Sequence, residues 1–145
     1  MDLIADLLAA QEDQRHELVE VNVAYDVARL MDCHLLSEIS RPEALKIMKM
    51  LNICSQSQKA RANVAFAVGR MVKERCLADC QDADISTLID LLAVCLAGEG
   101  AEINVAAAIE RLAEGDFLNR DEKLQIRLKL LLRKTCYVIF LKERF

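Results

Sequence analysis

One short string occurs three times in this chain at a fixed spacing, and this repeat constrains the fold more than any other feature. The string reads NVAYDVARLM at residues 22–31, NVAFAVGRMV at 63–72 and NVAAAIERLA at 104–113, so each copy begins 41 residues after the last. A fixed period of this length is typical of chains in which one structural unit stacks on the next. The spacing therefore predicts a repeat architecture.

The same period extends to other columns of the sequence. Two further sets of residues lie 41 apart, namely Cys54, Cys95 and Cys136, and Leu7, Met48, Ile89 and Leu130. These residues fall within apolar stretches such as IMKMLNIC and LIDLLAVC. Equivalent apolar positions in successive units predict one continuous core shared by the stack.

The residue types favour helices throughout. Only 4 Gly and 1 Pro interrupt the chain, and 54% of its residues are apolar. Pro42 begins a helical pattern at residues 42–54, and an Ala-rich pattern follows at 60–74. The segments at 33–40 and 75–84 have room for one or two further helical turns. We therefore expect a unit of one short helix, one longer helix and one Ala-rich helix.

This pattern predicts an all-α fold, a right-handed α-solenoid of about three repeats. We expect a single domain over residues 1–145. Its parts are a partial repeat at 1–31, repeats at 32–72 and 73–113, and a C-terminal capping or interaction helix at 119–145.

The composition limits the location, partners and function that we expect for the protein. No apolar run approaches the roughly 20 residues that span a bilayer, and the start of the chain lacks the basic region of a signal peptide. Six cysteines in helical apolar contexts indicate reduced thiols, so we expect a cytoplasmic protein, with the nucleus as an alternative. The net charge of −4 gives no reason to expect a nucleic-acid partner. Motifs of enzymes and cofactor sites are absent from the sequence, so we expect neither catalysis nor a cofactor.

The repeated string resembles the third helix of armadillo repeats. Residues 63–72 follow the family pattern N-A-A-W-A-L-S-N-L-A in spacing and character, and the period and the three-helix unit also fit. HEAT repeats are the nearest alternative. The resemblance implies that the Ala-rich helices line a concave groove that binds extended peptides. Two columns would face the peptide: the family's Trp column, here Tyr25, Phe66 and Ala107, and its Asn column, here Arg29, Arg70 and Arg111.

These columns give the candidate ligand groove. Its residues are Tyr25, Arg29, Phe66, Arg70 and Arg111. Packed helices lie about 8–10 Å apart, so the arginines would form a row suited to carboxylates or phosphates. We therefore expect the chain to be a protein-interaction or scaffold module, and the groove to bind an acidic or phosphorylated segment. In the alternative interpretation each arginine pairs with a carboxylate of its own repeat, such as Asp26 or Glu110, or caps the end of its helix, and the two aromatic rings belong to the core.

Two other groups of polar residues suggest roles in structure. The column formed by Asn22, Asn63 and Asn104 recurs with the fold, and we expect it to cap helices or to bridge to a neighbouring loop. Cys33, His34, Cys76 and Cys80 could meet as four zinc ligands across two units. The spacing lacks a second paired motif, so buried free thiols are the favoured interpretation and no metal site is predicted.

The C-terminal helix differs from the rest of the chain. Residues 120–145 carry eight Lys or Arg against three Asp or Glu, and apolar residues surround most of the helix. This helix either caps the stack or contacts a partner. The latter would make the chain a structural subunit or a homodimer. The predicted interface consists of Leu124, Leu128, Leu131, Leu132, Val138, Ile139 and Leu141.

Overall fold

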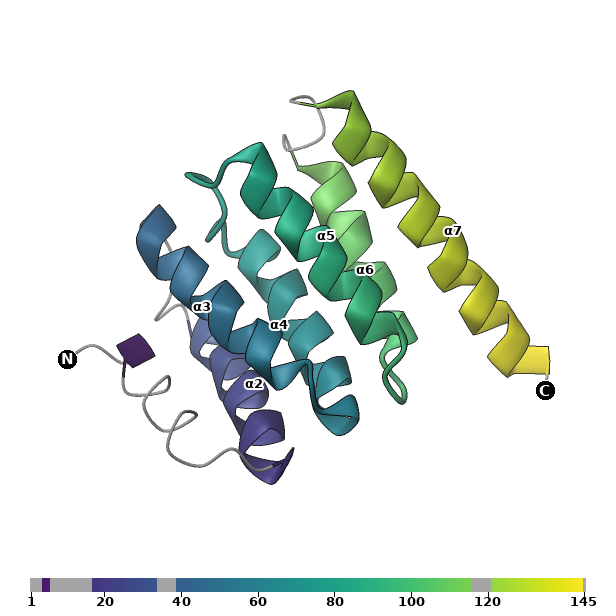
Figure 1. Ribbon diagram of the computed structural model, residues 1–145, viewed down its shortest axis with the longest axis horizontal. Coiled ribbons are helices and arrows are strands. Elements are labelled where there is room, and N and C mark those ends of the chain that lie inside the picture. The colour runs from purple at the N-terminus through teal and green to yellow at the C-terminus, as the bar shows by residue number, and fades with distance from the viewer. Residues whose placement is uncertain (1–3, 6–16, 34–38, 116–120, 145) are drawn as a thin grey trace.

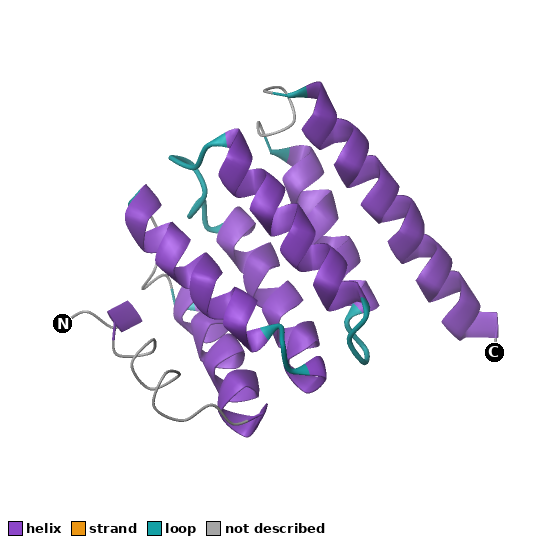
Figure 2. Ribbon diagram, viewed as in Figure 1, coloured by secondary structure: helices purple, strands orange, loops and turns teal. Residues whose placement is uncertain are grey.

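The computed structural model describes residues 4–5, 17–33, 39–115 and 121–144. In these residues the chain forms helices and turns and no strand, which confirms the all-α prediction (Figure 2). The helices are α2 (Glu17–Asp32), α3 (Arg41–Cys54), the short 3-10 helix η1 (Gln58–Ala60), α4 (Arg61–Lys73), α5 (Asp82–Leu96), α6 (Glu102–Glu114) and α7 (Glu122–Arg144).

The helices form two layers. Figure 1 shows α3, α5 and α7 side by side in the front layer, with α2, α4 and α6 behind them. In the rear layer α4 packs between α2 and α6, and α5 and α7 of the front layer pack onto α4 and α6. Helices one period apart in the sequence are therefore neighbours within one layer.

The repeated apolar columns form the core between the layers. Val27, Val68 and Ile109 are equivalent residues of α2, α4 and α6, and all three side chains are fully buried. Each buried aliphatic side chain of this size contributes about 1.5–3 kcal/mol through removal of apolar surface from water. A helix with such a stripe is not stable alone, and the stacking of equivalent helices buries the stripe.

Small residues allow the rear helices to approach closely. A Cβ atom added to Gly69 of α4 would lie only 3.7 Å from the Cα atom of Ala108 on α6. Ala67 and Ala108 are equivalent residues, and both are buried. The Ala-rich character of these helices thus follows from the short distance between their backbones.

The repeated asparagines connect neighbouring helices. The Asn63 Nδ2 donates to the Val21 carbonyl at 3.3 Å, and the Asn104 Nδ2 donates to the Ala62 carbonyl at 2.9 Å. In both cases the acceptor is the residue just before the asparagine of the preceding copy. Asn63 and Asn104 are therefore structural, but each bridges two helices of one layer instead of capping its own helix. Asn22, the first residue of the column, is exposed.

The segment after α4 is a turn, so the predicted short helix is wrong for residues 74–79. The Cys76 N–H donates to the Met71 carbonyl and the Arg75 N–H to the Val72 carbonyl, which is a Schellman motif. Arg75 adopts a left-handed conformation with φ 58°, and this conformation ends the helix. The corresponding segment of the preceding unit lies mostly outside the described residues. The described unit is thus a pair of long helices.

The 41-residue columns do not continue into α7. Leu130 and Cys136 are exposed, whereas their equivalents Ile89 and Cys95 are buried. The buried residues of α7 match buried residues of α5 at an offset of 40, namely Leu124 with Asp84, Leu128 with Leu88, Leu131 with Leu91 and Thr135 with Cys95. One residue corresponds to about 100° of helix rotation, which turns Leu130 and Cys136 toward solvent. Leu7, the first residue of that column, lies outside the described residues.

Candidate functional site

The candidate groove residues lie on the three helices of the rear layer. Tyr25 and Arg29 belong to α2, Phe66 and Arg70 to α4, and Arg111 to α6. Tyr25 and Arg29 are exposed, and the other three side chains are partly buried. The three arginines are equivalent residues of the repeat, 41 positions apart. They lie on neighbouring helices, because α4 packs between α2 and α6. The structure thus assigns the five residues to one layer, and Phe66 also packs against the core.

Two of the arginines stack on aromatic rings of their own helix. The Arg29 Cζ lies 5.8 Å from the centre of the Tyr25 ring, and the Arg70 Cζ lies 5.1 Å from the centre of the Phe66 ring. Each pair is four residues apart, which places both side chains on one face of a helix. A cation over an aromatic face is held by the ring quadrupole. The rings therefore orient these guanidinium groups on the surface of α2 and α4.

The third arginine crosses to the neighbouring helix. A Cβ atom at Gly69 would meet the Arg111 Nη1 at 3.3 Å, so the absence of a side chain at residue 69 gives this guanidinium its room. Gly69 directly precedes Arg70 in α4. The Arg111 head group, which belongs to α6, therefore lies against α4 beside the residue that carries the next guanidinium.

For Arg29 and Arg111, the alternative pairing with carboxylates of their own repeats does not form in the described part of the chain. There, neither Arg29 nor Arg111 has a hydrogen bond or an ion pair, and Asp26 and Glu110 are exposed. Guanidinium groups in this state retain their capacity for two parallel hydrogen bonds to a carboxylate or phosphate. This is the chemistry that these two side chains offer a ligand.

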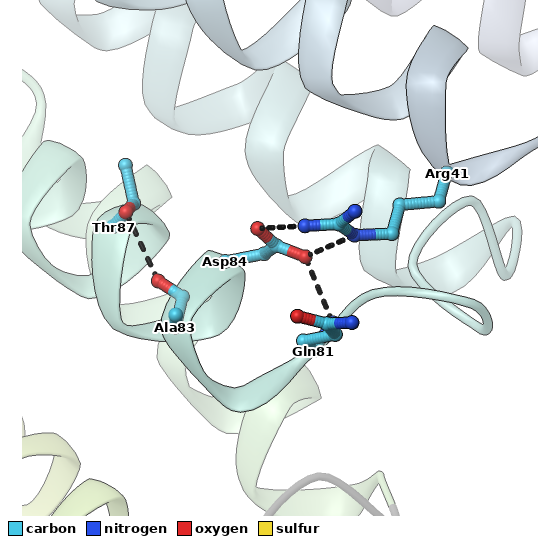
Figure 3. A network of polar contacts seen from close by, with 5 residues as sticks. All are labelled: Arg41, Gln81, Ala83, Asp84 and Thr87. Carbon is cyan, nitrogen blue, oxygen red and sulfur yellow. Dashed lines mark hydrogen bonds and ion pairs between the residues drawn. The ribbon is translucent and has the colours of Figure 1, made fainter.

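A second arginine site, not predicted from the sequence, connects α3 and α5. Arg41 donates to Asp84 through Nε at 2.8 Å and through Nη2 at 3.2 Å, and the Gln81 N–H donates to the same carboxylate at 2.8 Å (Figure 3). The Arg41 hydrogen bond lowers the pKa of Asp84 below its usual range, although burial opposes this shift. Asp84 also completes the capping box of α5. Its acceptors are occupied within the protein, so the site is structural.

The cysteines are separate thiols. Cys54, Cys76, Cys80 and Cys95 are buried, and Cys33 and Cys136 are exposed. Burial raises the pKa of Cys76 to about 11 and that of Cys95 to about 12, so both are protonated at neutral pH. Among the described residues no three His, Cys, Asp or Glu side chains gather as a metal site, and His34 of the zinc alternative lies outside them.

The predicted interface on α7 is largely part of the core. Leu124, Leu128 and Leu131 are buried, and Leu132 and Val138 pack partly against the same core. Ile139 is half-buried and Leu141 is exposed. Apolar residues surround most of α7 in the sequence, so its pattern does not separate the inner leucines from the outer ones. Most of these residues therefore stabilise the chain itself.

Polar contacts fix both ends of α7. Near its start, Arg127 bonds Ser86 and Asp90 of α5. Near its end, the Lys142 Nζ lies 3.0 Å from the Glu102 Oε2 of α6. The Glu102 pKa is lowered first by its own backbone N–H at the start of α6 and then by Lys142. These contacts attach α7 to both layers.

Comparisons with family models, curated proteins and solved structures find no match to this chain. Within the described residues, no helix has the length and apolar character needed to cross a membrane.

Proposed function

We propose that this chain is a non-catalytic protein-interaction module of the armadillo and HEAT class, and that its rear layer binds an extended acidic or phosphorylated segment of another protein. The fixed period, the two layers and the asparagine bonds between equivalent helices support a stacked repeat. The described unit has two long helices, which favours the HEAT type within this class.

The observation that carries the proposal is the placement of Arg111. Its guanidinium lies against Gly69 of α4 and has no hydrogen-bond or ion-pair partner among the described residues. Arg29 likewise has no such partner there and is held over Tyr25. Oriented guanidinium groups along one layer of helices favour a ligand with a repeated negative charge.

The spacing of the helices indicates the length of the ligand. Neighbouring packed helices lie about 8–10 Å apart, so the row from α2 to α6 spans about 16–20 Å. An extended chain covers about 3.3–3.6 Å per residue, and five or six residues would therefore reach from Arg29 to Arg111. Tyr25 and Phe66 would add contacts for the apolar parts of such a segment.

The test uses a labelled, unstructured acidic peptide of about eight residues, long enough for this row, with and without phosphoserines. Fluorescence anisotropy would measure its affinity for the full chain and for the Arg70→Glu and Arg111→Glu double variant. We expect the double variant to bind at least about tenfold more weakly, because it reverses two of the three charges in the row. The interaction should also weaken with added salt.

The matched control is the Lys46→Glu and Lys49→Glu double variant. Both lysines are exposed on α3 in the other layer, so the net charge changes equally without altering the groove. Equal loss of affinity in the two variants would mean that only overall charge matters. No binding by the wild-type chain to either peptide would reject an acidic segment as the ligand.

A further inference from the structure

The helix α7 carries a second apolar face opposite the one that it buries. Five large apolar side chains are exposed on it: Ile126 (52%), Leu130 (58%), Tyr137 (62%), Phe140 (50%) and Leu141 (36%). At about 100° per residue they form a stripe along the helix, on the side away from Leu124, Leu128 and Leu131. Single exposed apolar residues are ordinary, but an aligned set of this length is typical of an interaction surface.

The register of the repeat indicates what kind of element fits this stripe. On α5, Ser86 and Asp90 are the residues that receive the next helix of the layer, through Arg127 of α7. At the offset of 40 that relates the buried residues of α5 and α7, Ser86 and Asp90 correspond to Ile126 and Leu130. On α7, the outer stripe therefore includes the residues equivalent to those through which α5 contacts the next helix of the layer.

The charges in and beside the stripe indicate the chemistry of that helix. The outer part of α7 is strongly basic, with Lys123, Lys129, Arg133, Lys134 and Arg144 exposed against the exposed acids Glu122 and Glu143. At helical spacing Arg133 lies within the stripe, between Leu130 and Tyr137, and Lys129 and Lys134 lie on either side of it. The Arg144 guanidinium lies 5.0 Å from the centre of the Phe140 ring, so one cation rests directly on the stripe. A second copy of this chain would bring two basic surfaces together, and such like-charge contacts oppose association.

We infer that the outer face of α7 binds an amphipathic helix of a partner protein, with apolar residues along its centre and Asp or Glu on both sides. The partner's apolar residues would cover Leu130 and Tyr137, and its carboxylates would meet Arg133 and Lys134. This helix-on-helix surface differs from the groove of α2, α4 and α6, and a single chain could use both surfaces at once.

The experiment uses a designed amphipathic helical peptide with a leucine stripe flanked by glutamates, and a twin in which lysines replace the glutamates. Affinities for the full chain are measured by fluorescence anisotropy. We expect the glutamate peptide to bind and the lysine peptide to fail. A Leu130→Gln and Tyr137→Gln double variant should bind about ten- to a hundredfold more weakly, because two apolar contacts are lost.

Charge reversal gives a sharper test. The Arg133→Glu and Lys134→Glu double variant should no longer bind the glutamate peptide and should bind the lysine peptide. Val94→Gln is the matched apolar control, since Val94 is also exposed but lies on α5. All the substituted residues are exposed, and circular dichroism with thermal melting would verify that each variant is folded.

Three results would overturn the inference. The first is equal binding of the two peptides, or binding of neither. The second is dimerisation of the chain in sedimentation that Leu130→Gln abolishes, which would make a second copy the occupant. The third is binding to vesicles of phosphatidylcholine and phosphatidylserine that depends on Leu130 and exceeds peptide binding, which would make the face a membrane contact.

Discussion

The hydrogen bond from Asn104 to the Ala62 carbonyl gives the most direct test of how the rear layer is held together. Its donor–acceptor distance is 2.9 Å, and it joins α6 to α4 across a partly buried contact. A hydrogen bond of this kind contributes about 0.5–1.5 kcal/mol to stability after its exchange with water is counted. Removal of the amide in Asn104→Ala should therefore lower the free energy of unfolding by this amount relative to a matched control.

The control is Asn52→Ala on α3. The Asn52 side chain is exposed, and it has no hydrogen bond within the described residues. Both substitutions increase helix propensity, by up to about 0.7 kcal/mol, so the comparison removes most of this shared effect. Asn104→Asp should cost more than Asn104→Ala, because it keeps the shape of the side chain but directs an acceptor at the Ala62 carbonyl.

Urea denaturation followed by circular dichroism measures these differences, and thermal melting provides a second measurement. For a chain of this size 1 kcal/mol shifts the melting temperature by about 2–4 °C, so Asn104→Ala should melt roughly 1–6 °C below Asn52→Ala. Equal unfolding free energies for the two variants would refute the proposed contribution of the asparagine bond to stacking.

Three further substitutions test other parts of the fold. Arg75→Gly should stabilise the chain by about 0.5–1 kcal/mol in urea denaturation, because glycine adopts the left-handed backbone conformation at φ 58° without the steric strain of a side chain. An unchanged or lower midpoint would contradict this. Gly98→Ala should destabilise it by about 1–3 kcal/mol, since the new Cβ would lie 2.4 Å from the Arg61 Cβ, and an unchanged midpoint would show that the turn adapts freely. The Asp84 carboxyl has a lowered pKa, mainly through its hydrogen bond with Arg41. Its contribution to the free energy of unfolding is therefore complete above the unfolded pKa of about 3.9 and is lost as the pH falls through its folded pKa. Asp84→Asn should therefore be less stable than wild type at neutral pH, and the difference should close on acidification; a constant difference would argue against this linkage.

Much of the fold could be predicted from periodicity alone. The helical class, the stacking of the Ala-rich helices and the burial of columns such as Val27, Val68 and Ile109 follow from a repeat of apolar residues at helical spacing. The structural role of Asn63 and Asn104 was also predicted, but their acceptors were not. A side chain that repeats with the fold indicates a role in the fold, whereas its partner depends on the spacing of the helices.

The register of α7 could not be predicted in this way. Leu130 and Cys136 continue columns of identical spacing in the sequence, yet both are exposed. Which face of a helix is buried depends on how it packs, and α7 has leucines on both of its sides. When apolar residues surround a helix, the periodic signal that selects one face is weak.

Long-range polar contacts were beyond prediction for a related reason. Arg41 and Asp84 are 43 residues apart and belong to different columns, so the repeat itself does not pair them. Both lie in the first turns of neighbouring helices in the front layer, and this is apparent only once the layers are known. The candidate groove was predictable as a set because its residues recur, but the contact of Arg111 with the neighbouring helix was not.

The stacking of the rear layer and the placement of its arginines share one geometric relation. The asparagine bonds join residues 42 apart, and Arg111 also reaches a residue 42 before it, Gly69. In each case a side chain of one helix contacts the residue 42 positions earlier, on the preceding helix of the layer. The bonds that hold α6 against α4 therefore also set the distance between Arg111 and Arg70. If the groove binds an acidic segment as proposed, loosening this stack through Asn104→Ala should weaken that binding although residue 104 is not a groove residue. The same substitution should leave the affinity of the outer α7 face for its helical peptide unchanged, because that face lies on the far side of α7 from α6.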